Sequence, residues 1–367
     1  MHTIFQKFSL LEPKAQILSP FFFAGANTGA GFAGEYDRIA DERKNSRVWI
    51  LKGGSGTGKS TLIRKIADAA EETGHRCVRY LCSSDPDSLD AAVVDGKFVI
   101  LDGTAPHVRE MEYPGAVSEI VYVGKYWKRE LLEERREEII RLTKAKKDAY
   151  TAGYKVLSAL SGLEAETYRT AETLLDPDKM RRWIGRLLKG VPKGERTGET
   201  ETCRSWAVSM SGAVRTDGLA QAAEYHWLVE DTCETAPCFF SLLARMCREE
   251  RVPVCLSLHP VNDRVVEVFI PPLSLHLSLA AGKSAPDKTI CMNRFLQKEL
   301  PAGRKGEIHL SARCMTELLD MACGHFREAG EHHSALEEIY KGTMDFSQLN
   351  RESTLLKKQI LKYIEEN

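Results

Sequence analysis

Eight residues constrain this chain more than any others: GGSGTGKS, from Gly53 to Ser60. They fit the pattern G-x-x-x-x-G-K-[ST], in which a glycine-rich loop wraps around the phosphates of a nucleotide. The apolar run RVWILKG leads into them, and KSTLIRKIADAAEETG, which has helical periodicity and a final glycine, follows. A strand, a phosphate-binding loop and a helix in this order predict an α/β fold of the P-loop NTPase type.

The residue types in this loop suit a triphosphate. Glycines have no Cβ, so the backbone can pass close to the phosphates and turn its N–H groups toward them at the positive end of the next helix. Lys59 is expected to contact the β- and γ-phosphates, and Ser60 to ligate Mg²⁺. The predicted nucleotide-binding residues are Gly53, Gly54, Ser55, Gly56, Thr57, Gly58, Lys59, Ser60 and Thr61.

A second magnesium ligand should lie at the end of a buried strand, and FVILDG places Asp102 there. The next residue is Gly103, where many hydrolysing ATPases have a glutamate that activates water. The general base must therefore come from elsewhere, or hydrolysis is slow. Asp85 is a candidate base because strand ends line the ligand crevice of such sheets, although it could equally form the turn SSDPDS. His107 is either a γ-phosphate sensor or a loop residue. The predicted catalytic residues are Lys59, Asp85 and Asp102.

Strands that alternate with helices predict a doubly wound, mainly parallel sheet with helices on both faces. Residues 1–195 are expected to form the working nucleotide-binding domain, with a helical hairpin over 128–190. The glycine- and charge-rich stretch 189–202 is the best candidate linker. Residues 196–367 are expected to form a second copy of the domain that ends in helices.

The second copy is recognised by its pattern. HWLVED repeats the pattern of VWILKG, with Trp227 lying 178 positions after Trp49, and SWAVSMSG repeats FFAGANTG. The chemistry is lost, because an acidic residue would repel phosphate and proline lacks an N–H. We therefore expect this copy to bind no nucleotide. The aligned replacements are Gly53 to Asp231, Gly58 to Ala236, Lys59 to Pro237 and Ser60 to Cys238.

Composition excludes several classes of protein. Lys and Arg number 51 against 52 Asp and Glu, so overall charge gives no argument for a nucleic-acid or anionic-membrane partner. No apolar run approaches the roughly 18 residues that span a bilayer, and the first residues do not have the pattern of a secretory signal. The 10 cysteines include no Cys-x-x-Cys pair, which favours free thiols and a cytoplasmic protein.

The runs FFFAGANTGAGF, WILKGGSGTGKST, CSSDPDSLD, FVILDGTAPH and YPGAV, with ALEEIYKGTMDF near residue 340, resemble an uncharacterised family of bacterial ATP-binding proteins with tandem P-loop domains. The resemblance covers most of the chain. It implies a P-loop fold and ATP binding, and it names no substrate. The family usually has a phosphate loop in its second half, and this chain departs from that pattern.

These features predict a Mg-ATP-binding ATPase or nucleotide switch with one working site. One alternative is a kinase for a small molecule, in which Asp85 orients an acceptor hydroxyl and Arg129, Arg135 and Arg136 close as a lid, although a solvated helix face is the simpler interpretation of these arginines. Another alternative is a nucleotide-dependent interaction protein with negligible turnover and an unknown protein partner. The first half has no Asn/Thr-Lys-x-Asp guanine motif, which favours ATP over GTP. His325, His332 and His333 are interpreted as a helix surface rather than a metal site.

Overall fold

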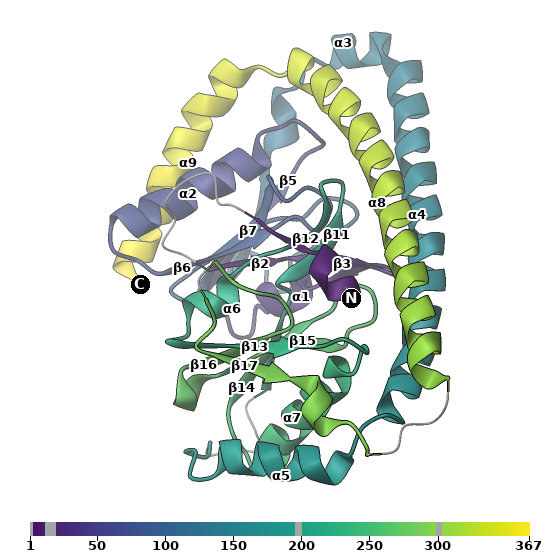
Figure 1. Ribbon diagram of the computed structural model, residues 1–367. Coiled ribbons are helices and arrows are strands. Elements are labelled where there is room, and N and C mark those ends of the chain that lie inside the picture. Colours follow the sequence, from purple (N-terminus) through teal and green to yellow (C-terminus); the bar gives the residue numbers. More distant parts are fainter. Residues whose placement is uncertain (1–2, 12–19, 195–199, 284, 299–302) are drawn as a thin grey trace.

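The computed structural model describes residues 3–11, 20–194, 200–283, 285–298 and 303–367. The protein is a mixed α/β structure with a six-stranded sheet in each half. Two long helices, α4 (Arg136–Glu172) and α8 (Arg304–Thr343), run side by side along both halves (Figure 1). Within the described ranges, no helix has both the length and the apolar character needed to cross a membrane.

The first sheet is mixed rather than purely parallel. β7 is antiparallel to both of its neighbours, whereas the other neighbouring strands pair in parallel. The sequence analysis did not anticipate this strand. The links before and after β7 are short turns, and such turns can join only antiparallel strands, because a parallel crossover needs a dozen or more residues. In spatial order the strands are β2 (Phe21–Phe23), β6 (Cys77–Leu81), β7 (Leu89–Val94), β8 (Phe98–Asp102), β5 (Arg47–Lys52) and β9 (Ser118–Tyr122).

The second sheet has the same order and the same strand directions. Its third strand is again antiparallel to both neighbours. Both sheets also shift register at the corresponding place, between Tyr80 and Leu81 in one and between Ser257 and Leu258 in the other. The strands are β10 (Thr200–Cys203), β14 (Val254–Leu258), β15 (Val265–Ile270), β16 (Leu275–Ser278), β13 (Tyr225–Glu230) and β17 (Lys288–Cys291).

The two faces of the first sheet have different covers. Trp49 and Leu51 face a core shared with α2 (Lys59–Glu72) and α9 (Phe346–Glu366). Val48 and Ile50, which alternate with them, face the opposite way toward the one-turn helix α1 (Tyr36–Ile39) and Phe32. The sequence predicts helices on both faces. Long helices cover only one face, and the other face is covered by the one-turn helix α1 and Phe32. Phe32 belongs to a hairpin of β3 (Gly25–Thr28) and β4 (Gly31–Gly34).

The segment expected to form a hairpin, 128–190, contains α3 (Arg129–Glu134), α4 and α5 (Pro177–Leu188). The long partner of α4 is α8, from the second half of the chain. The helices pack closely enough that a Cβ on Gly153 of α4 would come within 2.8 Å of the Phe326 ring of α8.

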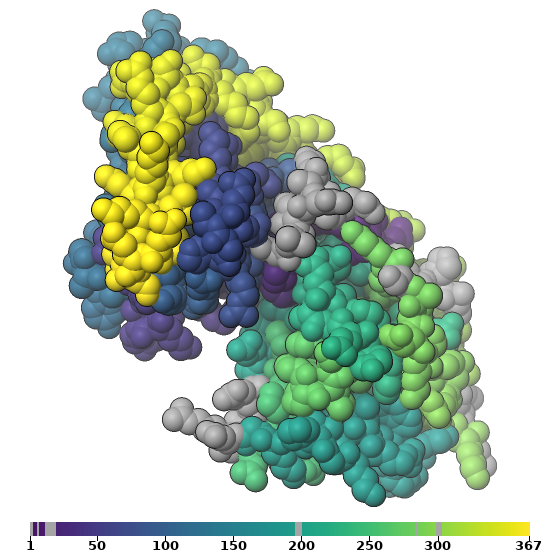
Figure 2. Space-filling model, turned by 90° about the vertical axis from the view of Figure 1, so that its left-hand side faces the viewer, coloured from purple at the N-terminus to yellow at the C-terminus, as the bar shows by residue number. Residues whose placement is uncertain are grey.

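The two halves exchange their last helices. α5 follows the first sheet in sequence but packs on α7 (Ala236–Glu249), with the Trp183 and Phe239 rings 5.6 Å apart. α9 follows the second sheet but packs on the first, where Tyr363 lies 5.8 Å from Trp49. Figure 2 shows the yellow α9 against the blue first half and away from the green residues of the second.

Matching hydrogen bonds fix the exchange at both ends. The Asp345 N–H donates to Tyr126 O (2.9 Å), and the Asp176 N–H donates to Phe295 O (2.8 Å). A second pair of hydrogen bonds is arranged in the same way. The Lys128 N–H donates to Thr343 O (2.8 Å), and the Gln297 N–H donates to Leu174 O (2.9 Å). Each residue lies 169 positions from its counterpart. Asp176 and Asp345 also cap the N-termini of α5 and α9 with their carboxylates.

Short elements connect the halves. The Asn27 side chain in β3 donates to Val208 O at 2.8 Å, which joins the hairpin β3–β4 to the hairpin β11–β12. The remaining elements are η1 (Ile4–Lys7), β1 (Ser9–Leu10), β11 (Trp206–Ser209), β12 (Gly212–Arg215), η2 (Val123–Tyr126), α6 (Gly218–Gln221), η3 (Pro271–Leu273) and η4 (Met292–Phe295).

Candidate functional site

The predicted phosphate loop connects β5 to α2, as the sequence analysis expects. Gly56 and Gly58 have φ angles of +69° and +80°, in the left-handed region that favours glycine. A Cβ on Gly53 would come within 2.6 Å of the Val123 side chain, and one on Gly56 within 2.8 Å of Glu337 O. The glycines thus allow a tight loop that is also covered closely from outside.

The structure brings Lys59, Ser60 and Asp102 together. The buried Lys59 ammonium donates to Gly53 O at 2.8 Å and Gly54 O at 2.7 Å, and lies 3.5 Å from the Asp102 carboxylate. The Ser60 hydroxyl accepts the Leu89 N–H at 2.8 Å. The ammonium is held by its own loop, so a phosphate entering the loop would have to draw it away from those carbonyl oxygens.

Asp102 is oriented by the residues that follow it. Its Oδ1 accepts the Thr104 N–H at 2.9 Å and also the Thr104 hydroxyl. His107 Nε2 lies 4.0 Å from the same oxygen. His107 therefore lies in the site rather than on an outlying part of the loop.

Asp90 in β7 is a site residue that the sequence analysis missed. It is buried, and it accepts the Tyr36 hydroxyl at 2.6 Å. The Tyr36 ring in turn stacks on His107, with centroids 4.5 Å apart. Burial raises the pKa of the Asp90 carboxyl. The available signal was a single charged residue in the apolar run LDAAVV, since an acidic side chain is rarely buried without a specific partner.

Asp85 lies in the turn between β6 and β7. Its carboxylate accepts the Asp87 N–H at 3.1 Å, and its carbonyl accepts the Ser88 N–H at 3.0 Å. Burial raises the pKa of Asp85, and the nearby charges of Asp87 and Glu337 raise it further. This geometry supports the turn interpretation, and the carboxylate grouped with Asp102 is Asp90.

The end of α8 covers the loop. The Glu337 carboxylate accepts a hydrogen bond from Lys341 at 2.8 Å and lies near the Gly56 N–H. Although burial alone would raise it, Lys341 and the nearby N–H hold the pKa of Glu337 below its usual range. His333, one turn earlier, has its pKa lowered by burial and by the positive charges of Lys146 and Lys59. No local sequence pattern indicates that residues this far along the chain reach the loop.

The corresponding loop of the second half is occupied by its own carboxylate. Asp231 accepts the N–H groups of Cys233 at 3.0 Å and Ala236 at 2.7 Å, and the Thr235 hydroxyl at 2.8 Å. The donors at the start of α7 are thus paired with an internal anion.

The other candidates lie elsewhere. Arg129 is exposed and near Glu133 (3.6 Å), and Arg135 pairs with Glu138. Arg136 begins α4 and is exposed. His325 lies 3.8 Å from Glu328 on α8.

A family model described as Nephrocystin 3, N-terminal, matches residues 33–94, which run from β4 through the loop and α2 to β7. The match covers a minority of the chain and stops before Asp102. No curated protein and no solved structure matches the chain. Over residues 33–94 the chain is therefore similar to this N-terminal domain family.

Proposed function

We propose that the first half binds one Mg²⁺–nucleoside triphosphate, ATP in preference to GTP, in the loop Gly53–Thr61. One observation carries the proposal: a glycine loop at the start of α2 holds the Lys59 ammonium 3.5 Å from Asp102, with Ser60 beside them. Loop N–H groups, a helix N-terminus and an ammonium suit a polyphosphate, and a hydroxyl with a carboxylate suits Mg²⁺. The residues present therefore fit the nucleotide and its metal.

In the proposed reaction, Lys59 leaves the carbonyls of Gly53 and Gly54 and neutralises the β- and γ-phosphates. Ser60 and Asp102 would hold Mg²⁺, which offsets the charge that develops on the phosphates. Gly103 supplies no side chain to activate water, so we propose slow hydrolysis, as in a nucleotide switch. Asp90 lies beside Asp102, whereas the Asp85 carboxylate is engaged in its own turn, which makes Asp90 a stronger candidate base than Asp85.

We propose that α8 reports the nucleotide state. The Glu337 carboxylate lies near the Gly56 N–H, a donor that phosphate-binding loops use for phosphate. A bound triphosphate would compete for this N–H and would repel the carboxylate. Movement of the end of α8 would then pass to α4 and to the second half, because the two helices pack along their length (Figure 1).

We also propose that each half is a P-loop NTPase-type domain derived from a duplication, with the second half nucleotide-silent. The equal strand orders and the equal spacing of the reciprocal hydrogen bonds support a common origin. The Asp231 carboxylate, which takes the donors of the second loop, supports the loss of nucleotide binding.

Calorimetric titration with a non-hydrolysable ATP analogue and Mg²⁺ tests the proposal. We expect one site per chain, lost in Lys59→Ala and retained in Lys65→Ala, a matched change at an exposed lysine of the same helix. Two sites would contradict the silent second half. Absence of binding, or binding that survives in Lys59→Ala, would contradict the proposed loop. Competition with GTP measures the nucleotide preference.

A further inference from the structure

Three side chains converge beside the loop in a way that phosphate binding does not require. Asp90, Asp102 and His107 each direct one ligand atom into the same space, with all of these atoms within 4.8 Å of one another. They come from β7, from the end of β8 and from the loop after β8. Of the three, only Asp102 is a proposed ligand of the nucleotide's Mg²⁺, and Asp90 is proposed there only as a base.

His107 is the unusual member. Its side chain is only 8% exposed, and across the described chain neither ring nitrogen has a hydrogen-bond partner. A buried polar group without a partner costs about 1–3 kcal/mol. The imidazole is nevertheless held firmly, stacked on Tyr36 at 4.5 Å with Phe32 at 6.1 Å. An unpaired nitrogen held in this way faces two carboxylates.

We propose that Asp90, Asp102 and His107 bind a divalent transition-metal ion when no nucleotide is present. Two carboxylates and an imidazole are a mixed oxygen and nitrogen set that suits Mn²⁺, Fe²⁺ or Zn²⁺, whereas Mg²⁺ prefers oxygen ligands. The inference goes beyond the proposed function, because it does not require the loop to bind nucleotide.

The ligands have the supporting contacts that metal sites use. The Tyr36 hydroxyl orients Asp90, and the Thr104 N–H and hydroxyl orient Asp102. Such partners hold ligands in place before the ion arrives.

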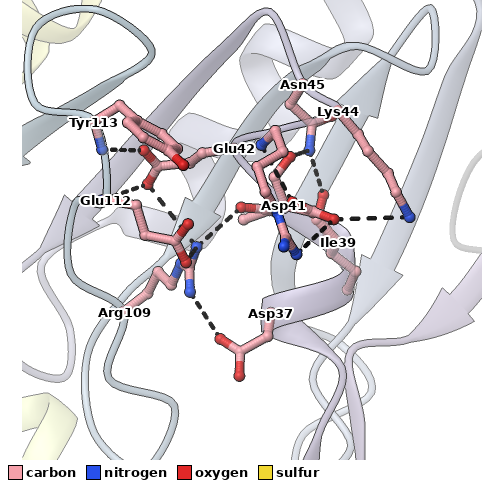
Figure 3. Close-up of polar contacts among 11 residues, drawn as sticks. Asp37, Ile39, Asp41, Glu42, Lys44, Asn45, Arg109, Glu112 and Tyr113 are labelled. Carbon is pink, nitrogen blue, oxygen red and sulfur yellow. Dashed lines mark hydrogen bonds and ion pairs between the residues drawn. The ribbon is translucent and has the colours of Figure 1, made fainter.

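A second network fixes the loop that carries His107 (Figure 3). Arg109, two residues later, donates to Asp37 at 2.8 Å and to Glu112 at 3.0 Å. Buried Glu42 accepts the N–H groups of Glu112 and Tyr113 at 3.0 and 2.7 Å. The loop is thus tied to α1 through Asp37 and to the segment after α1 through Glu42, which reduces the cost of ordering His107 for a ligand.

Lys59 gives the test its sharpest contrast. Its ammonium lies 3.5 Å from Asp102 and opposes a cation there. Lys59→Ala should therefore tighten metal binding by a few-fold, although the same variant should lose the nucleotide. The two sites thus respond in opposite directions to one change.

The experiment is a titration of the full chain with Mn²⁺ without nucleotide, followed by electron paramagnetic resonance. Mn²⁺ is chosen because thiolates favour Zn²⁺, and the chain has 10 cysteines. We expect one bound Mn²⁺ per chain and at least tenfold weaker binding in both His107→Ala and Asp90→Asn. Binding should be unchanged in His325→Ala, a matched histidine outside the cluster.

A measurement on the unmodified protein covers the case in which a variant fails to fold. Electron spin-echo modulation of the bound Mn²⁺ should show coupling to a nitrogen of His107. Absence of Mn²⁺ binding, absence of nitrogen coupling, or undiminished binding in His107→Ala would overturn the inference. Mn²⁺ binding without analogue binding would support the metal site and contradict the proposed nucleotide site, so the two can fail separately.

Discussion

At the level of single residues, buried titratable side chains lie beside the loop that precedes α7. Glu164 of α4 accepts the Asn262 amide at 2.6 Å, and His259 Nδ1 lies 3.7 Å from the same carboxyl group. Burial raises the pKa of Glu164 to about 8 and lowers the pKa of His259 to about 3. Both side chains are therefore neutral in the folded protein at pH 7.

These two shifts predict a pH dependence of stability. Glu164 binds its proton more tightly when folded, so it lowers the free energy of unfolding as pH rises from about 4.5 toward 8. His259 acts in the opposite sense, and only below its unfolded pKa of about 6.5. Between pH 6.5 and 8, Glu164 alone of this pair contributes, by roughly 1–2 kcal/mol.

Urea unfolding of Glu164→Gln at pH 6.5 and 8 checks this prediction. The amide cannot ionise, so the loss of stability over this interval should be smaller than in the unmodified protein by that amount. Glu166→Gln, at an exposed position on the same helix, is the control and should leave the pH dependence unchanged. Equal pH dependence in Glu164→Gln and the unmodified protein would contradict the raised pKa.

Local patterns explain which site residues could be predicted. Lys59, Ser60 and Asp102 were predictable as a group because a loop motif and a strand end are recognised from a few neighbouring residues. Asp90 was missed because it lies in an antiparallel strand that alternation alone did not reveal. The sequence alignment of SWAVSMSG with FFAGANTG also differs by two positions from the structural correspondence of these segments. The turn hydrogen bonds match Thr28 with Ser209 and Gly31 with Gly212, so one sequence offset does not fit all parts of the two halves.

At the level of secondary-structure elements, the contact of α8 with the loop Gly53–Thr61 predicts that a change in α8 alters nucleotide affinity. Glu337→Gln removes a negative charge near the expected phosphates and weakens the attraction between this side chain and the Gly56 N–H. We expect affinity for the Mg²⁺–ATP analogue to rise by about 3- to 10-fold, equivalent to roughly 1 kcal/mol. Glu338→Gln, at the exposed next position, should change it little. Calorimetry provides the measurement, and unchanged or weaker binding in Glu337→Gln would contradict a gating role.

Periodicity indicated that the segments forming α4 and α8 are helical, but it did not indicate their partners. A helix with apolar residues on one side can pack on a sheet, on its own hairpin or on a distant helix with equal local preference. The deciding contacts are specific and distant, such as the fit of Phe326 against Gly153. Such a pair has no signature in either segment alone.

At the scale of the whole molecule, the exchanged helices predict that the halves depend on each other. A fragment of residues 1–195 retains α2 but lacks α9, whose Ile360 and Ile364 are buried in the first core. Exposing two such side chains costs roughly 3–6 kcal/mol, a large part of the stability of a typical domain.

Separate production of fragments 1–195 and 196–367 tests this dependence. Each should show a weak or absent cooperative unfolding transition by circular dichroism. A mixture refolded together should recover a 1:1 complex by size-exclusion chromatography and a sharper transition. Two fragments that fold independently and do not associate would contradict the prediction.

The exchange also sets the order in which the protein can be completed during synthesis. More than 270 residues separate the end of α2 from the start of α9, and ribosomes add roughly 5–20 residues per second. The apolar face of α2 therefore leaves the ribosome roughly 14 to 55 seconds before the helix that covers it. During that interval the nascent chain presents an uncovered apolar surface that a chaperone could bind. The loop Gly53–Thr61 likewise lacks its cover until the end of α8 has been synthesised.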